Sequence, residues 1–244
     1  NWKRDELAKA LARVRVPALV AGLVLLAALP FGGLKGVATA GGLGLASWLI
    51  AGSVWILGRR WWSGRAYLAR AILTTPRSII GLVVAHAGLG LLTLGITGVT
   101  AWDSDKVLNM KVGESVVFAG RTLTMTDYEL VAGPNYEAKQ ARFSVKGAVG
   151  AYELRSEKRF YPSAQSQTTE AGIRAGPLGN LYVSVGDESE AGVVVRLWDQ
   201  PLIVWIWIGG FAMAAGGAVS LSDRRLRVGA AVKTLPVAQP VPAE

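Results

Sequence analysis

The chain has 244 residues, 51% of them hydrophobic, and a formal net charge of +9. This composition is more apolar than that of an ordinary soluble globular protein, so we expect a lipid bilayer to be part of its environment. The positive charge does not indicate binding to nucleic acid, because the one long polar segment, residues 102–199, holds eleven Lys or Arg against thirteen Asp or Glu.

Residues 1–13 are predicted to form a basic leader on the cytoplasmic side. Trp2, Leu7 and Leu11 recur at helical spacing among Lys and Arg, which is typical of a helix lying in the membrane interface. A solvated basic leader explains the same pattern. Because the sequence starts at Asn1 rather than Met, we expect a fragment or a processed piece of a longer protein.

Four apolar segments follow the pattern of membrane-spanning helices. A helix needs about 20 apolar residues to cross about 30 Å of hydrocarbon. We therefore predict a polytopic α-helical membrane protein with about four transmembrane helices. The first two lie within residues 14–58, the third at 78–101 and the fourth at 200–222; their apolar runs are residues 14–31, 37–57, 79–101 and 201–221.

The loop at residues 59–77 determines the predicted orientation. It contains five arginines and no acidic residue, so the positive-inside rule places it in the cytoplasm. Alternation along the chain then places residues 102–199 outside the cytoplasm and the tail, residues 223–244, inside. The tail has three prolines and few large apolar residues, and we expect it to be disordered.

Residues 102–199 change from helical runs to the alternation of half-buried strands, as at Val193, Val195 and Leu197. Glycines interrupt the segment at short intervals. The pattern predicts an inserted extracytoplasmic all-β domain, with six to eight short strands in a small barrel or sandwich. The chain has no cysteine, so this domain uses no disulfide, and any thiol in a reaction must come from a partner.

His86 is the only histidine, and it lies inside the third apolar segment, where ionisable residues are rare and usually face a partner or a cavity. Helical spacing places Gly90 and Thr93 on the same face, which therefore combines an imidazole, a notch lacking a side chain and a hydroxyl group. Neutral imidazole is a common axial ligand of haem iron, so we predict that this face binds a transmembrane b-type haem. The alternative is a buried histidine bonded to a hydroxyl or carbonyl group on the next helix.

Gly81, Gly88 and Gly95 repeat every seven residues on a face that points largely away from His86. A stripe of small residues lets a neighbouring helix backbone approach closely. We expect this seam to hold the helix bundle together.

A compact charged cluster marks the outer domain. It consists of Glu157, Lys158 and Arg159, with Glu170 following, and we predict that it binds a partner. The alternative is a solvated strand end, which contributes little to stability. The only histidine lies in the membrane, so no Ser/His pairing supports a hydrolytic site and the catalytic residues stay unassigned.

Several motifs carry a resemblance to a known family. They occur from Pro76 onward: Pro76-Arg77-Ser78, Ala85-His86, Gly133-Pro134-Asn135-Tyr136, Glu157-Lys158-Arg159, and the run at residues 220–225. In these the chain resembles the C-terminal part of CcmF, the haem lyase subunit of cytochrome c maturation, and its relative NrfE. The first two apolar segments match that family only in hydropathy.

The resemblance implies a function in the bacterial inner membrane. Members of the family attach haem, delivered by the haem chaperone CcmE, to the thiols of apocytochrome c in the periplasm. By resemblance, His86 is one of two axial ligands of a b-type haem. The implied partners are the remaining N-terminal portion of the lyase, CcmH/CcmI-type subunits, CcmE, apocytochrome c and membrane lipid.

The chain also departs from the family. The tryptophan-rich outer segment, the two outer histidines that flank it and a second membrane histidine have no counterpart here. We therefore expect the chain to be an incomplete component of a lyase. The alternative function is a non-catalytic docking or assembly module for cytochrome maturation partners.

Overall fold

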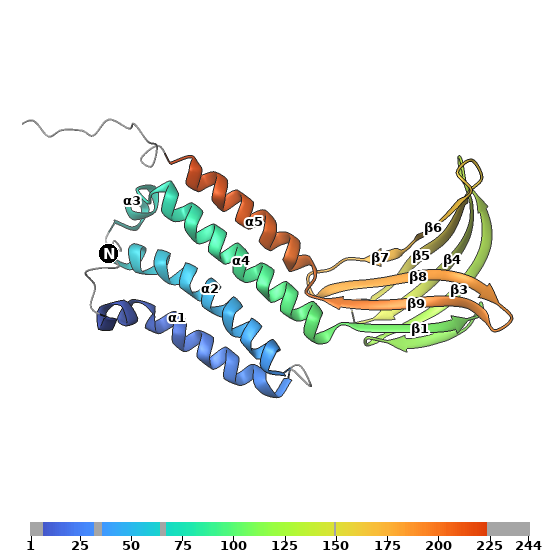
Figure 1. The fold of residues 1–244 in the computed structure, drawn as a ribbon, viewed down its shortest axis with the longest axis horizontal. Helices are drawn as coiled ribbons and strands as arrows, with labels where there is room; N and C mark the ends of the chain where they lie inside the picture. The colour runs from blue at the N-terminus through green and yellow to red at the C-terminus, as the bar shows by residue number, and fades with distance from the viewer. Residues whose placement is uncertain (1–6, 32–35, 64–66, 149, 224–244) are drawn as a thin grey trace, which may run out of the picture.

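A computed structural model describes residues 7–31, 36–63, 67–148 and 150–223. Helices form one end of the molecule and a curved β-domain forms the other (Figure 1). The predicted disordered tail lies outside the described residues except for Asp223, and so does the first half of the predicted leader.

The helices follow the four apolar segments. They are α1 Leu7–Ala28 with a short 3-10 turn at Leu29–Phe31, α2 Gly36–Ser63, α3 Leu68–Leu73, α4 Arg77–Trp102 and α5 Val204–Leu221. Among the described residues, α2, α4 and α5 are long and apolar enough to cross a membrane, whereas the apolar part of α1, Val14–Ala28, is shorter. Of the about four spanning helices predicted, three therefore reach the length of a span, and the count of four stays a prediction.

Helix α2 continues to Ser63, past residue 58, where we expected a loop to begin. Its 28 residues make it about 42 Å long, which exceeds the roughly 30 Å of a hydrocarbon core. Arg59 and Arg60 therefore lie on the last turns of a helix, and the short helix α3 occupies part of the segment predicted as loop.

The glycine seam on α4 holds α5, as predicted. A Cβ atom added at Gly88 would lie 2.8 Å from the Gly209 carbonyl oxygen, and one added at Gly216 would lie 2.6 Å from the Gly81 carbonyl oxygen. Both distances are too short for a real Cβ, so the two backbones meet only because glycines face each other. Helix α4 lies between α5 and α2, and α1 packs on the outer side of α2 (Figure 1).

Nine strands in the described part of the chain form two antiparallel sheets, more than the six to eight predicted. One sheet has the order β1-β9-β8-β7 and the other the order β2-β3-β4-β5-β6. The strands are β1 Ser104–Met110, β2 Ser115–Phe118, β3 Arg121–Ala132, β4 Glu137–Gly147, β5 Gly150–Tyr161, β6 Ser166–Glu170, β7 Gly172–Arg174, β8 Gly179–Ser189 and β9 Gly192–Pro201. The domain is a sandwich, and the barrel alternative was wrong.

Alternating side chains from both sheets fill the sandwich. Leu123, Met125 and Phe143 of one sheet meet Val183 and Leu197 of the other, and all five are fully buried. Helix α4 leads directly into β1, and β9 leads into α5, and these two strands pair from Ser104 with Asp199 onward. Both connections therefore leave the same end of the domain, side by side, where the glycine seam joins their helices.

Candidate functional site

His86 lies near the middle of α4, with its side chain exposed on the helix surface. Its Nδ1 lies 2.8 Å from the carbonyl oxygen of Leu82, one turn earlier on the same helix. A carbonyl oxygen only accepts hydrogen bonds, so Nδ1 carries the proton and Nε2 keeps its lone pair. The alternative interpretation was a histidine bonded to a group on the next helix. The carbonyl partner belongs instead to α4 itself.

A small groove adjoins His86. It has a volume of about 210 Å³, and α1, α2 and α4 contribute its walls, among them Pro17, Trp48, Gly52 and Leu82. A Cβ atom added at Gly52 would meet no atom within 4 Å, so this glycine leaves an open flat area on α2. The imidazole therefore stands at the edge of an apolar groove, and its Nε2 has no hydrogen-bond partner within the described part of the chain.

The predicted notch at Gly90 is filled. A Cβ atom there would lie 2.7 Å from the Ile50 Cγ1 atom and 3.0 Å from the Ala46 carbonyl oxygen, because α2 packs against this part of α4. The Thr93 hydroxyl group donates to the Leu89 carbonyl oxygen at 2.8 Å. Neither Gly90 nor Thr93 lines the groove at His86. Sequence reasoning missed Gly52, because the spacing that identified Gly90 considered α4 alone.

The groove fits one side of a haem rather than a whole haem. A free Nε2 next to an apolar surface is the arrangement of an axial imidazole ligand, and the bonded Nδ1–H fixes the orientation of the ring. The volume of about 210 Å³ is below the roughly 300–1,000 Å³ of ordinary ligand pockets. A macrocycle held here would therefore extend beyond the surface that this chain supplies.

The structure brings together three of the four predicted partner-binding residues in the outer domain. The Arg159 Nε donates to the Glu157 Oε2 at 2.8 Å, and the Arg159 Nη1 lies 3.7 Å from the Glu170 Oε1. Glu157 on β5 is also the register partner of Glu170 on β6. Lys158 points to the opposite face of β5, where it pairs with Asp187 of β8. The period of two along a strand separates Lys158 from its sequence neighbours.

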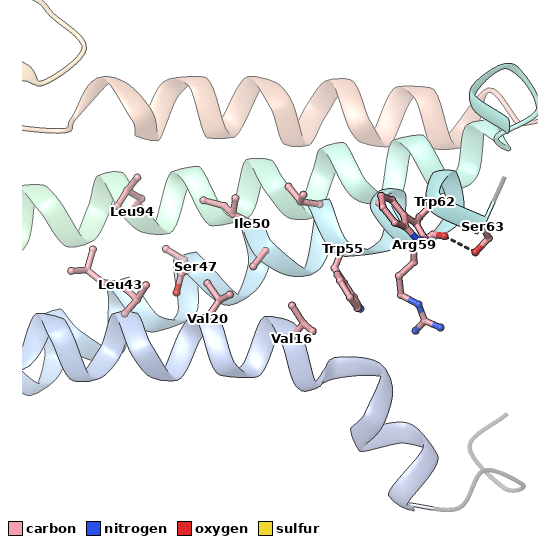
Figure 2. A pocket seen from close by; sticks show the side chains of 15 residues that line it. Val16, Val20, Leu43, Ser47, Ile50, Trp55, Arg59, Trp62, Ser63 and Leu94 are labelled. Carbon is pink, nitrogen blue, oxygen red and sulfur yellow. Dashed lines mark hydrogen bonds between the residues drawn. The ribbon is translucent and has the colours of Figure 1, made fainter. Parts of the chain in front are cut away.

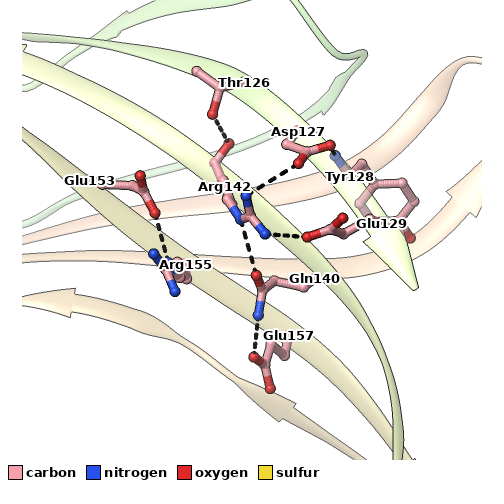
Figure 3. A network of polar contacts seen from close by, with 9 residues as sticks. All are labelled: Thr126, Asp127, Tyr128, Glu129, Gln140, Arg142, Glu153, Arg155 and Glu157. Carbon is pink, nitrogen blue, oxygen red and sulfur yellow. Dashed lines mark hydrogen bonds and ion pairs between the residues drawn. The ribbon is translucent and has the colours of Figure 1, made fainter. Parts of the chain in front are cut away.

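Glu157 also belongs to a larger polar network on the outer face of this sheet (Figure 3). The Gln140 Nε2 donates to the Glu157 Oε1 at 2.6 Å, and the Arg142 Nε donates to the Gln140 Oε1 at 3.2 Å. Arg142 also pairs with Asp127 and Glu129 of β3. Gln140 and Arg142 were not predicted, although their alternation along β4 is a signal for a shared face.

Hydrogen bonds in this network favour the charged forms of Glu157 and Arg159. Burial raises the pKa of Glu157, but the hydrogen bonds from Arg159 and Gln140 outweigh burial and leave the pKa below its ordinary value. The hydrogen bond to Glu157 in turn raises the pKa of Arg159. The network therefore presents fixed charges of both signs at neutral pH.

Residues 101–201 match the family described as CcmF C-terminal beta-sandwich, which covers the β-domain and its two connections. The chain is 43% identical over 237 residues to the cytochrome c-type biogenesis protein CycK of Rhizobium meliloti, across 94% of this chain and 35% of the relative. It is 34% identical over 231 residues to the cytochrome c-type biogenesis protein CcmF of Escherichia coli, across 93% of this chain and 34% of the relative.

The chain belongs to the CcmF family. It corresponds to a C-terminal portion of CcmF-type proteins and spans about a third of the length of these curated relatives. The fold is also similar to a solved structure named Cytochrome c Heme Lyase CcmF, with a TM-score of 0.65 and 23% identity over 90% of this chain and 35% of the other. The family resemblance found from short motifs is thereby confirmed, and it extends over α1 and α2, for which the sequence offered only hydropathy.

Proposed function

We propose that this chain is part of a cytochrome c maturation haem lyase of the bacterial inner membrane, and that His86 is an axial ligand of a transmembrane b-type haem. The supporting observation is the hydrogen bond from the His86 Nδ1–H to the Leu82 carbonyl oxygen, which leaves Nε2 free at an apolar groove. The names of the relatives, cytochrome c-type biogenesis proteins, support the pathway.

The residues around His86 have defined tasks in this proposal. The Leu82 carbonyl oxygen sets the tautomer and the ring orientation. Gly52 leaves room for a flat group beside the ring, and Trp48 and Leu82 keep water away from it. A haem bound there would supply one-electron transfer, by which the haem destined for apocytochrome c would be kept reduced.

The second axial ligand and the rest of the haem pocket belong, in this proposal, to the N-terminal portion of the protein. Two observations support this division. The groove encloses only about 210 Å³, and His86 is the only histidine of the chain. CcmE and CcmH/CcmI-type subunits are the partners that the family resemblance adds.

The β-domain lies in the periplasm in this proposal, because the basic residues on α2 and α3 favour the cytoplasm at the opposite end of the helices. Its outer face, with Glu157, Arg159 and Glu170, is proposed to contact apocytochrome c or a partner subunit. A reporter fused at Gly176 should be active only outside the cytoplasm. Activity only inside would contradict this orientation.

The test of the haem proposal is a reduced-minus-oxidised absorption spectrum of the purified full-length protein with its partners. We expect His86→Ala to lose the b-type signal. Leu89→Ala is the matched control, because Leu89 is exposed on the next turn of α4 and does not line the groove. A spectrum unchanged in His86→Ala would refute haem ligation and leave the docking module as the function.

A further inference from the structure

A second and larger groove runs between α1 and α2 (Figure 2). It has a volume of about 920 Å³, and most of its walls are aliphatic, with Val16 and Val20 from α1, Leu43 and Ile50 from α2, and Leu94 from α4. It lies within the apolar length of the helices, so an occupant of this part must itself be apolar.

The groove is charged at one end only, among the residues that the structure describes. Trp55, Arg59 and Ser63 follow one another at spacings of four residues, so they lie on one face of α2. The indole Nε1 of Trp55 is buried and has no hydrogen-bond partner within the described part of the chain. In Figure 2 the Arg59 guanidinium extends into the space beside α1, and the first turns of α1, before Pro17, bend away from α2.

A basic cavity continues from this end. Its volume is about 550 Å³, and its walls are formed by Arg59, Arg60, Ser63, Ala71 and Thr74. Arg59 and Ser63 line both spaces. Among the residues that the structure describes, no acidic side chain lines either of them, so these wall neighbours do not balance the charge of the two arginines.

We propose that this groove is a binding site for an anionic phospholipid. One acyl chain would lie along the aliphatic walls between α1 and α2, and the phosphate would lie between Arg59 and Arg60, because guanidinium groups bind phosphate oxygens in a forked geometry. The Trp55 side chain, one turn deeper than Arg59, would line the space beside the glycerol region of the lipid. Basic pockets between helices at the cytoplasmic end are suited to anionic headgroups.

The aliphatic walls alone would accept an apolar helix from the remaining portion of the protein equally well. The basic end distinguishes the two occupants, since an apolar helix would leave the two guanidinium groups without acceptors. An anionic phospholipid fits both parts of the site, because its acyl chain matches the aliphatic walls and its phosphate matches the basic end.

The test is native mass spectrometry of the full-length protein in detergent, with phosphatidylglycerol and phosphatidylcholine as probes. We expect phosphatidylglycerol to bind in preference, and Arg59→Gln to weaken its binding by about fivefold. The matched control is Arg70→Gln, which removes the same charge from α3 but lines neither cavity. Ala51→Phe, which fills the groove, should weaken the binding of both lipids.

Equal phosphatidylglycerol binding by the Arg59→Gln and Arg70→Gln variants would overturn the proposal. So would undiminished lipid binding by a folded Ala51→Phe variant, because the lipid would then bind outside the groove. Size-exclusion chromatography of each variant establishes folding, and Arg59→Gln carries the test if Ala51→Phe does not fold.

Discussion

The hydroxyl oxygen of Ser156 accepts the backbone N–H of Val185 at 3.0 Å and so joins the two sheets of the β-sandwich. Ser156 lies on β5 and is fully buried, and Val185 lies on β8 in the other sheet. The same hydroxyl group donates to the Glu170 carbonyl oxygen on β6 at 2.8 Å. One side chain therefore satisfies backbone groups of two further strands, one in each sheet.

Ser156→Ala should loosen this corner of the domain. Removing the hydroxyl group leaves the buried N–H of Val185 without its partner, which costs about 1–3 kcal/mol. Amide hydrogen exchange at Val185 in the full-length protein should accelerate by roughly 5–150-fold. Ser144→Ala, on the outer face of β4, serves as the control, and equal protection in both variants would show that the Ser156 bonds do not matter.

The glycine seam predicts opposite effects for two adjacent positions on α5. A Cβ atom at Gly209 would lie 2.5 Å from the Leu92 backbone nitrogen, whereas one at Gly210 would meet nothing within 4 Å. Gly209→Val should therefore separate α4 from α5 and cost about 1–3 kcal/mol or more by overpacking. Gly210→Val should be tolerated. Thermal melting of the purified protein measures both, and similar melting temperatures would disprove close packing at Gly209.

The sequence predicted features that depend on local residue patterns, but not contacts between segments that lie far apart along the chain. The seven-residue glycine repeat and the alternation of strand residues are local patterns, and both predicted the correct packing faces. The contact between Gly90 and Ile50 was not predictable, because nothing on α4 indicates which of its faces α2 will cover. Likewise, the hydrogen bond between Ser78 and Asp223 was not predictable, because the two residues lie 145 positions apart and no periodicity links them.

Asp223 caps helix α4 from the far end of the chain. The backbone N–H of Ser78 in the first turn of α4 donates to the Asp223 Oδ2 at 3.0 Å. An acceptor at this place satisfies a free helix N–H group and complements the helix dipole. Asp223→Ala should lower stability by about 1 kcal/mol, and Asp223→Asn should lower it less. Thermal unfolding in detergent measures the order of stability among wild type, Asp223→Asn and Asp223→Ala. Equal stability of these three proteins would contradict a capping role.

Stability of the outer domain should depend on pH through Glu157, whose side chain is 16% exposed. Its pKa is lowered in the folded protein, so the carboxylate adds stability above its unfolded pKa of about 4.3 and loses it as the pH falls through the folded value. The stability difference between wild type and Glu157→Gln should therefore be constant near neutral pH and shrink below about pH 4.3. A pH-independent difference between wild type and Glu157→Gln would refute the assignment.

The open surface at Gly52 allows the haem proposal to be tested without changing the ligand. Gly41 and Gly52 both lie on α2, and a Cβ atom at either would meet nothing within 4 Å, but only Gly52 lines the groove at His86. Gly52→Leu should therefore fill the groove and lower the haem content of the purified full-length protein several-fold, whereas Gly41→Leu should leave it unchanged. His86→Gly should regain a b-type spectrum when imidazole is added, because free imidazole can replace the deleted ring as a ligand. If Gly52→Leu retained full haem content while His86→Gly lost it, the macrocycle would lie on another side of His86, and the groove between α1, α2 and α4 would not be its binding surface.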